Sequence, residues 1–488
     1  MSLLALREQL FHAASAAVAD PTPLAVPDPL VHFMNRTSFG IREADYQRAG
    51  AMGYAAFVES QLQPSAAAAA GVEAVIAANL LSINMTGAQL YLAYPPSENK
   101  DFAALNELRA ATLLRQVYSP NQLFEVMVEF WTNHFSIEHL HGFDRIAKTI
   151  DDQDIRKNAM GKFKDLLNAS ARSPAMLFYL DNYVNVKTGA QENYSRELME
   201  LHTLGVDGGY TEEDVKHVAR AFTGWGFNRT QISFQFSQRN HDTTEKVALG
   251  KTLAKDRGMQ DAQDLLDLLA AHPSTAKLIA TKLVRRFVSD APPAALVEKL
   301  SALFLSSGGD ITVMLRALFN SVDFIASADL KVKRPQEYVQ SVLRVTDAKI
   351  SGMTYNRALT SVYEGLGQIW CNWSAPNGYP DVGSYWINTT AWLGRWNFVF
   401  AALEGRLDRG IVIDALALAG GAKTPDAMVD KLSGRVLRRK LSFADRAELI
   451  RSAAAGANPS DPLRSDLLSV RARQIVALML SSRYFNYR

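Results

Sequence analysis

The chain has 488 residues, of which 48% are hydrophobic and 21% charged, as in ordinary globular proteins and unlike disordered ones. Its 52 basic and 50 acidic residues leave a formal charge of +2, so no overall field would attract nucleic acid. The single cysteine, Cys371, excludes an intrachain disulfide and any multi-cysteine metal site. We interpret Cys371 as a small packed residue, because free cysteine is among the most buried residue types.

The N-terminal segment lacks a basic start and is interrupted by Arg7 and Glu8, which is not typical of a signal peptide. No run of about 18 apolar residues marks a membrane span. As written, the sequence predicts a cytoplasmic protein. We expect residues 1–28 to form a lead segment and residues 29–488 to form one large helical domain. An alternative subdivision has motif-bearing helices at 29–227, a hairpin at 228–252 and C-terminal helices at 253–488.

Helical patterns cover most of the chain. The clearest start signal is Ser119-Pro120, which predicts an N-cap and first helical residue for a helix over 121–135. That helix is apolar nearly all round and should be buried, with His134 pointing inward. Ser173-Pro174 repeats the signal. The other expected helices cover 30–34, 41–49, 54–62, 66–81, 154–171, 261–272, 274–289, 294–306, 312–322 and 336–345, and three or four more close the chain.

One segment has the alternation of a strand, with Ile232, Phe234 and Phe236 separated by polar residues. We expect a small β-hairpin insertion near 231–250. An aromatic loop, Trp370 to Trp386, contains proline and glycine that exclude a regular element. The predicted fold class is therefore mainly α, a large multi-helix globular domain with one hairpin.

The stretch from Gln191 to Trp225 concentrates polar chemistry in two short helices joined by a glycine turn. Thr211 and Asp214 have the spacing of a helix cap, and Gly224 is a plausible stop. At 100° per residue, the first helix divides into a polar stripe and an opposite apolar stripe. The polar stripe holds Asn193, Arg196, Glu197 and Glu200, and the apolar stripe holds Tyr194, Leu198, Leu201 and His202.

Glu197 and Glu200, three residues apart, can both bind a metal ion or divide acid and base roles. Alternatively, Arg196 holds neighbouring carboxylates in a structural ion-pair network without any catalysis. Asn193, Asn133 and Trp225 are the candidate substrate-binding residues.

Histidines supply the remaining candidate ligands. His134 ends a buried helix, and His241 follows the hairpin, where a turn could return it to the helix pair. His139 and His141 have the i, i+2 spacing of a ligand pair in a loop or strand, and His217 lies on an amphipathic helix. No H-E-x-x-H motif, phosphate loop or G-x-S-x-G elbow is present in the sequence. Oxygen and imidazole ligands without thiolate would suit Zn, Fe or Mn.

Several blocks, in this order and spacing, resemble a large bacterial family catalogued as domain of unknown function 1800. The blocks are FWTNHF at 130–135, YLDN at 179–182, ENYSRELMELHTLGVDGGYTEEDVKHVARAFTGW at 192–225 and HDTTEKVALG at 241–250. The resemblance extends from about Leu30 to Tyr487. It implies no activity, because the family is known by its sequence alone.

Many family members carry export signals and are encoded beside a second uncharacterised family with a twin-arginine signal. The resemblance thus implies a partner protein encoded nearby, and partner-assisted export to the periplasm as the alternative location. This chain has Thr132 where members often have histidine, which weakens a two-histidine site on that helix. Position 202 is often phenylalanine, so His202 ranks behind His134, Glu197, Glu200 and His241.

These observations lead to three hypotheses. The first is a metal-dependent hydrolase or oxidoreductase in which His134, His241, Glu197 and Glu200 bind the metal or transfer protons, and Arg196 and Asn193 orient the carboxylates or an anionic substrate. The second is a non-catalytic binding or export-associated scaffold with a structural Arg–Glu network. The third assigns carbohydrate or peptide binding to the aromatic loop.

Overall fold

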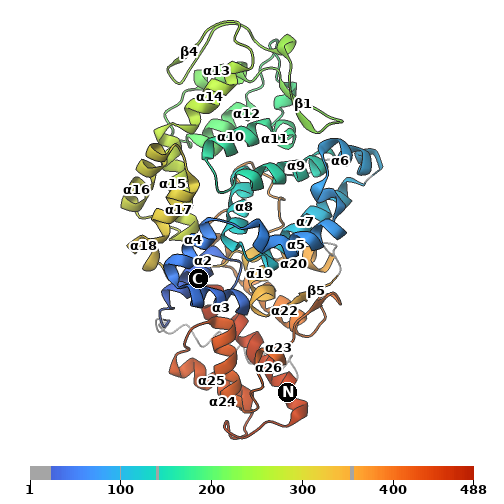
Figure 1. Ribbon diagram of the computed structural model, residues 1–488, viewed down its shortest axis with the longest axis vertical. Helices are drawn as coiled ribbons and strands as arrows, with labels where there is room; N and C mark the ends of the chain where they lie inside the picture. The colour runs from blue at the N-terminus through green and yellow to red at the C-terminus, as the bar shows by residue number, and fades with distance from the viewer. Residues whose placement is uncertain (1–23, 99, 139–141, 352–356) are drawn as a thin grey trace.

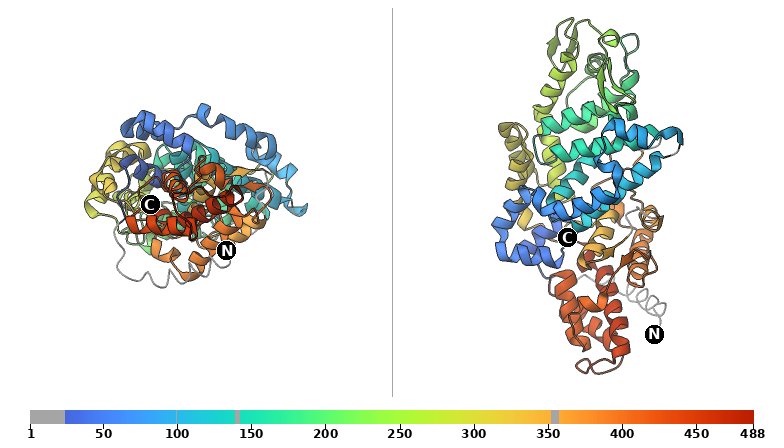
Figure 2. Two further views of the ribbon diagram at one scale, coloured as in Figure 1. Left: turned by 90° about the horizontal axis from the view of Figure 1, so that it is seen from below. Right: turned by 45° about the vertical axis from the view of Figure 1, so that its right-hand side comes forward.

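The computed structural model describes residues 24–98, 100–138, 142–351 and 357–488. The molecule is elongated, with residues 190–260 at one end and the helices after residue 410 at the other (Figure 1). The N-terminal helices cross the middle, and the last residues return there, beside the first helices (Figure 2). Every sheet in the described ranges has two strands, which confirms a mainly α fold.

The first helices follow the predicted pattern closely. Asp28 caps the opening helix by accepting a hydrogen bond from the Leu30 amide at 2.8 Å, with Pro29 at the first turn. The helix expected at 66–81 ends at Asn79, and a long helix that we did not predict begins at Asp101. The elements are α2 (Pro29–Thr37), α3 (Glu43–Met52), α4 (Tyr54–Leu62), α5 (Ala66–Asn79), η1 (Leu81–Asn84), α6 (Gly87–Ala93), η2 (Pro96–Glu98) and α7 (Asp101–Tyr118).

The Ser-Pro signals had different outcomes. Ser119 ends α7 instead of capping the next helix, which begins at Gln122 behind the N-cap Asn121, so the predicted start was displaced by two residues. Ser173 does cap its helix. The helix expected at 154–171 is two helices, interrupted around Gly161. These elements are α8 (Gln122–His134), α9 (Gly142–Asn158), α10 (Phe163–Arg172), α11 (Pro174–Tyr179) and η3 (Asn182–Val184).

The central stretch forms α12 (Asn193–Glu197), the π-helical segment η4 (Leu198–Thr203) and α13 (Glu212–Ala221). The Thr211–Asp214 capping box that we predicted is present at the start of α13. Two hairpins follow instead of one. The first pairs β1 (Trp225–Asn228) with β2 (Ser233–Phe236), and after η5 (Gln238–Asn240) the second pairs β3 (Lys246–Ala248) with β4 (Lys251–Leu253).

Glycine is needed at the junction of α13 and the first hairpin. Gly224 has a φ of 79°, and a Cβ there would lie 2.5 Å from the Ser237 carbonyl oxygen. Both the left-handed backbone and this close approach exclude a side chain. The turn therefore fixes the direction in which the chain leaves the central stretch.

The C-terminal half is helical with short connections, as predicted. One helical turn, α21, ends the aromatic loop, which corrects our expectation that the loop holds no regular element. The elements are α14 (Gln260–Ala270), α15 (Pro273–Phe287), α16 (Ala294–Ser307), α17 (Ile311–Phe319), α18 (Val322–Ile325), α19 (Pro335–Val345), β5 (Lys349–Ile350), α20 (Arg357–Gly365), α21 (Gly383–Trp386), α22 (Thr389–Leu403), β6 (Ile411–Val412), α23 (Ala415–Leu418), α24 (Pro425–Leu432), η6 (Ser433–Leu437), α25 (Phe443–Ala454), α26 (Ser465–Ser481) and α27 (Arg483–Asn486).

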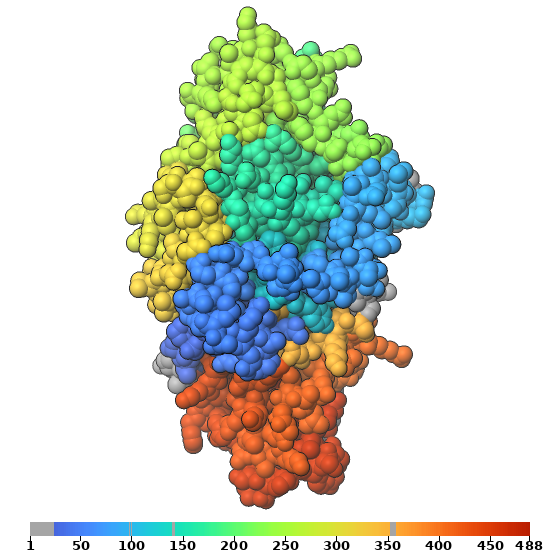
Figure 3. All heavy atoms as spheres, viewed as in Figure 1, coloured from blue at the N-terminus to red at the C-terminus, as the bar shows by residue number. Residues whose placement is uncertain are grey.

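Two clusters of buried apolar side chains form the core. The first joins α2–α4, α6, α8–α18 and one residue of α7 with the hairpins, and the second joins α5 and most of α7 with α19, α20 and α22–α27. The space-filling view shows helices α2–α7, in blue, lying across the middle of the molecule, between the two ends (Figure 3). The division into one domain, or into the three parts of the alternative subdivision, stays a prediction.

Buried ion pairs lie where α8, α15 and α19 meet. The Glu337 carboxylate accepts hydrogen bonds from the side chains of Arg286, Arg334 (3.0 Å) and Arg488 (2.8 Å). Glu129 lies 2.7 Å from Arg334 and 3.5 Å from Arg286. All five residues are buried. Burial alone would raise the pKa of Glu337, but the three guanidinium groups outweigh it and hold that pKa well below its usual range.

A further buried arginine ties the first helix to distant segments. The Arg36 guanidinium, fully buried, donates to the backbone carbonyls of Phe287 (2.9 Å), Val288 (3.0 Å) and Ser327. Burial lowers its pKa well below the usual value. These bonds connect α2 to residues more than 250 positions later in the chain.

Candidate functional site

The polar stripe of the central stretch lies at the surface of the protein. Tyr194, Leu198 and His202 are buried, as the helical wheel predicted, whereas Asn193 is exposed and the rest of the stripe is half-buried. The π-helical segment changes the phase of the helix after Glu197, and the Leu204 amide bonds to the Met199 carbonyl, five residues back. It nevertheless keeps His202 on the buried side.

Arg196 links the two helices of the stretch. Its guanidinium donates to both carboxylate oxygens of Glu212, at 2.9 and 2.8 Å, and to Glu192 at 3.3 Å. The hydrogen bonds to Glu212 are the main cause that raises the pKa of Arg196. This is an Arg–Glu network of the kind in the second hypothesis, with Glu192 and Glu212 as partners instead of Glu197 and Glu200. Because the Arg196 side chain is 34% exposed, the network contributes little to stability.

Glu197 and Glu200 influence each other electrostatically. Burial, followed by the charge of Glu200, raises the pKa of Glu197. Burial and the charges of Glu138 and Glu197 raise the pKa of Tyr179 to about 12. The two carboxylates lie on the half-buried face of α12 and η4, where the charge of Glu200 favours the protonated form of Glu197.

His134 contacts neither glutamate; its hydrogen bonds go to a lysine and a backbone carbonyl. Lys282 of α15 donates from Nζ to His134 Nδ1 at 2.8 Å. The opposite nitrogen, Nε2, lies 3.1 Å from the carbonyl oxygen of His202. Since Nδ1 accepts from an amine and Nε2 faces an acceptor, the geometry fixes the neutral tautomer with hydrogen on Nε2. We call Lys282, His134 and His202 the basic trio.

The basic trio consists of three basic groups in an apolar environment. Burial, and then the charge of Arg285, lowers the pKa of Lys282 to about 8. Burial and the neighbouring Lys282 lower the pKa of His202 to about 3 and that of His134 well below its usual value. Within the described ranges, Lys282 has no carboxylate partner, and His202 Nε2 is buried without a hydrogen bond. These surroundings keep the two imidazoles neutral near pH 7 and make the Lys282 ammonium lose its proton more readily than an ordinary lysine.

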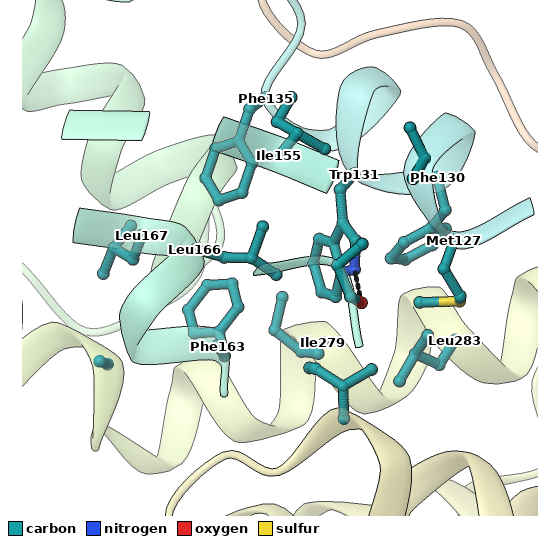
Figure 4. Close-up of a cluster of buried hydrophobic side chains, with 14 of the residues drawn as sticks. Met127, Phe130, Trp131, Phe135, Ile155, Phe163, Leu166, Leu167, Ile279 and Leu283 are labelled. Atoms are coloured by element: carbon teal, nitrogen blue, oxygen red, sulfur yellow. Dashed lines mark hydrogen bonds between the residues drawn. The ribbon is translucent and has the colours of Figure 1, made fainter. Parts of the chain in front are cut away.

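Aromatic rings enclose the imidazoles of the trio. The His134 ring lies 4.5 Å from the Phe135 ring and 6.2 Å from the Phe163 ring, and the His202 ring lies 5.2 Å from that of Phe135. Trp131, one turn before, donates from Nε1 to the Ala159 carbonyl at 2.9 Å and fixes α8 against the segment before α10. Figure 4 shows these rings with Ile279 and Leu283, which flank Lys282 on α15.

His241 belongs to a different network. Its Nδ1 lies 2.9 Å from the Thr223 carbonyl oxygen, and its Nε2 lies 3.3 Å from Asp261, which also accepts from Lys246 at 2.8 Å. Both ring nitrogens face oxygen acceptors, so neither presents a lone pair to a metal ion. The fully buried His241 ties the second hairpin to α14.

The predicted metal ligands are therefore not brought together. His134 belongs to the basic trio, His241 to the hairpin network, and Glu197 and Glu200 to the half-buried helix face. Across the residues that the structure describes, no group of three or more His, Cys, Asp or Glu side chains is arranged to hold a metal ion. His139 and His141 lie outside the described residues.

Asn133 clamps the aromatic loop onto α8. Its side-chain amide donates to the Tyr379 carbonyl at 2.9 Å and its oxygen accepts from the Tyr379 amide at 2.8 Å. Glycine at position 378 allows the loop to come this close to α8, since a Cβ there would lie 2.1 Å from the Asn133 carbonyl oxygen. The clamp leaves a cavity of about 20 Å³ between the loop and α8, which is large enough for about one water molecule.

Two further side chains are Trp225, a candidate substrate-binding residue, and Cys371, which is half-buried. Trp225 is fully buried in β1, with the Arg172 guanidinium 5.1 Å from its ring centre. Burial raises the pKa of the Cys371 thiol to about 12, so the thiol stays protonated at neutral pH, in agreement with our interpretation of a packed cysteine. Neither side chain forms an open reactive surface.

Sequence reasoning missed Lys282. A weak signal for it exists, because position 282 follows Ile279 by three residues and therefore lies at the edge of the apolar face of α15. A lysine there usually extends its amine to water, and nothing local indicates that His134, 148 positions earlier, accepts its hydrogen bond.

No helix in the described part of the chain is both long and apolar enough to cross a membrane. No curated protein and no solved structure matches the chain. A family model does match, over residues 32–487, and its description is "Protein of unknown function (DUF1800)". With nearly the whole sequence matched, the chain belongs to the DUF1800 family.

Proposed function

We propose that the protein is an enzyme in which the Lys282 amine attacks the carbonyl carbon of a substrate. The observation that carries the proposal is the hydrogen bond from Lys282 to the neutral imidazole of His134, with no carboxylate on the amine among the described residues. A lysine becomes a nucleophile at neutral pH when it is desolvated or lies beside another cation, and Lys282 has both conditions, with Arg285 as the cation.

The chemistry balances without any other reagent. The Lys282 ammonium gives up a proton to His134 Nδ1, and the lone pair of the resulting amine forms a C–N bond while the C=O π electrons move to oxygen. That oxygen takes up two protons, one from the attacking nitrogen and one back from the His134 imidazolium, and leaves as water. The nitrogen lone pair forms the C=N bond as the C–O bond breaks, so ammonium and carbonyl compound become a protonated imine. His134 is suited to hold the proton briefly, because burial disfavours its charged form and returns the proton.

Reductive trapping tests the proposal. The protein is incubated with propanal and cyanoborohydride at pH 7, and alkylated lysines are identified by mass spectrometry. Lys277, exposed on the same helix, is the matched control. With a pKa of about 8 against about 10.4 for an ordinary lysine, the free-amine fraction of Lys282 is about 200-fold larger. We expect labelling at Lys282 first, with a midpoint near pH 8.

Two variants complete the experiment. Lys282→Arg removes the label, and Lys277→Arg leaves it unchanged. Labelling of Lys282 that is no faster than that of Lys277, in folded protein, contradicts the proposal, because an enclosed or fully charged amine has no nucleophilic role.

The metal-dependent hydrolase or oxidoreductase has a separate test. Protein purified without an affinity tag is analysed for metal and melted with and without chelator; a stoichiometric metal whose removal lowers the melting temperature supports it. The non-catalytic scaffold is favoured by one observation, the surface network of Arg196 with Glu212. If Arg196→Gln abolishes binding to a partner protein and leaves the propanal labelling of Lys282 unchanged, the scaffold function is supported.

A further inference from the structure

A cleft of about 740 Å³ lies between α3, α5 and α7, with β5 at one side. Its size falls in the range of small-molecule sites, which usually measure about 300–1,000 Å³. None of the three residues of the basic trio lines this cleft, so the cleft and the trio are separate sites.

The walls of the cleft are mostly apolar. Val72 and Val75 of α5 face Leu114 of α7, and Ile350 completes this part of the lining. Val75 is 43% exposed. Apolar side chains that remain in contact with water in a concave surface favour a ligand with an apolar body, because its burial removes both surfaces from water.

The rim of the cleft is cationic. Arg42 and Arg48 both line it, whereas Asp45 is its single acidic lining residue. The Asp45 carboxylate is already shared by two guanidinium groups, those of Arg48 at 3.5 Å and of the buried Arg344. Arg42 donates from Nε to Asp347 at 2.9 Å. The Arg48 side chain is 38% exposed, and its Nη1 has no hydrogen-bond partner among the described residues. The rim therefore has donor capacity for one more anion.

We propose that this cleft binds an amphipathic carboxylate, a linear aliphatic acid with its chain along Val72, Val75 and Leu114 and its carboxylate at Arg48. The apolar walls and the guanidinium with a spare donor match the two ends of such a molecule. This site is independent of the imine chemistry at Lys282.

Gly71 allows the cleft to be blocked without disturbing the fold. It lines the cleft, and a Cβ at this position would meet no atom within 4 Å. Gly71→Trp should fill the cleft, and Gly71→Ala should leave it open. Both replacements remove a glycine from the interior of α5, which favours the helix.

Dodecanoate below its micellar concentration is titrated into the full chain by calorimetry, with dodecanol as the uncharged comparison. We expect one saturable site for dodecanoate, retained in Gly71→Ala, lost in Gly71→Trp and weakened about tenfold in Arg48→Gln. Dodecanol should bind at least tenfold more weakly than the acid. Equal binding by Gly71→Trp, equal binding of the alcohol, or no saturable binding each overturns the proposal. Circular dichroism of each variant confirms that the helices are intact.

Discussion

The buried cluster around Glu337 gives the most demanding test of the structure. Glu337→Gln keeps the size of the side chain and one accepting oxygen but removes the charge that faces Arg286, Arg334 and Arg488. Breaking a buried ion pair by removing one partner costs about 3–5 kcal/mol. Because Glu129 still lies 2.7 Å from Arg334 and 3.5 Å from Arg286, we expect the lower end, about 3 kcal/mol.

The assay is thermal unfolding at pH 7 with a matched surface control. Glu59→Gln breaks the pair of Glu59 with Arg316, whose side chains are 43% and 39% exposed, so it should cost at most about 1 kcal/mol. With an unfolding entropy of about 2.1 cal/mol/K per residue, a cooperative transition of this chain shifts by about 1 °C per kcal/mol. Glu337→Gln should therefore melt about 3 °C lower and Glu59→Gln within about 1 °C of the wild type.

The pH dependence of the stability of Glu337→Gln provides a second, independent test. The folded-state pKa of Glu337 is lowered, so its stabilising contribution is present above the unfolded value of about 4.3 and is lost as pH falls through the folded value. The gap between wild type and Glu337→Gln should shrink in acid. A melting temperature for Glu337→Gln equal to that of Glu59→Gln, or a gap that widens on acidification, refutes the reasoning.

Three further predictions concern single side chains. His202→Phe should remove an acid sensitivity of folding. The pKa of His202 is about 3 in the folded wild type and about 6.5 in the unfolded chain, so its contribution to stability is complete above pH 6.5 and falls between pH 6.5 and 3, by about 3 kcal/mol at pH 4.5. Parallel pH profiles of the two proteins in urea unfolding would contradict this. Thr211→Ala removes the cap of α13 and should cost about 1 kcal/mol in the same assay; no change would mean that the cap carries no stability. Cys371 should react with iodoacetamide at pH 8 about 1,000-fold more slowly in folded than in unfolded protein, and equal rates by mass spectrometry would show an accessible thiolate.

What the sequence predicted well was local. The capping box of Thr211 with Asp214 and the Ser173 cap were identified because a cap depends on residues within one turn. Ser119 was assigned to the wrong helix end because a serine beside a proline suits either the end of one helix or the start of the next. The break at Gly161 was missed because the amphipathic pattern continues on both sides of it.

The candidate site depended on long-range contacts that no local pattern contains. We predicted that His134 points inward, and it is buried. Its partner Lys282 could not be predicted, because the pattern of α15 shows only that Lys282 lies at the edge of the apolar face of that helix. His241 was expected near the central helix pair, yet Asp261 and Thr223 take both of its nitrogens. Periodicity predicts which face of a helix is buried, whereas the partner across the interface depends on the tertiary arrangement.

The carbonyl contacts of Arg36 have a consequence for synthesis on the ribosome. The partners of this guanidinium, at residues 287, 288 and 327, are made more than 250 residues after it. At about 5–20 residues per second, about 15–60 s pass between the synthesis of Arg36 and that of Ser327, the last of its three partners. During that interval a charged helix with an apolar face is exposed on the nascent chain. A chaperone that binds nascent chains should therefore be released late, after α17 and α18 have emerged.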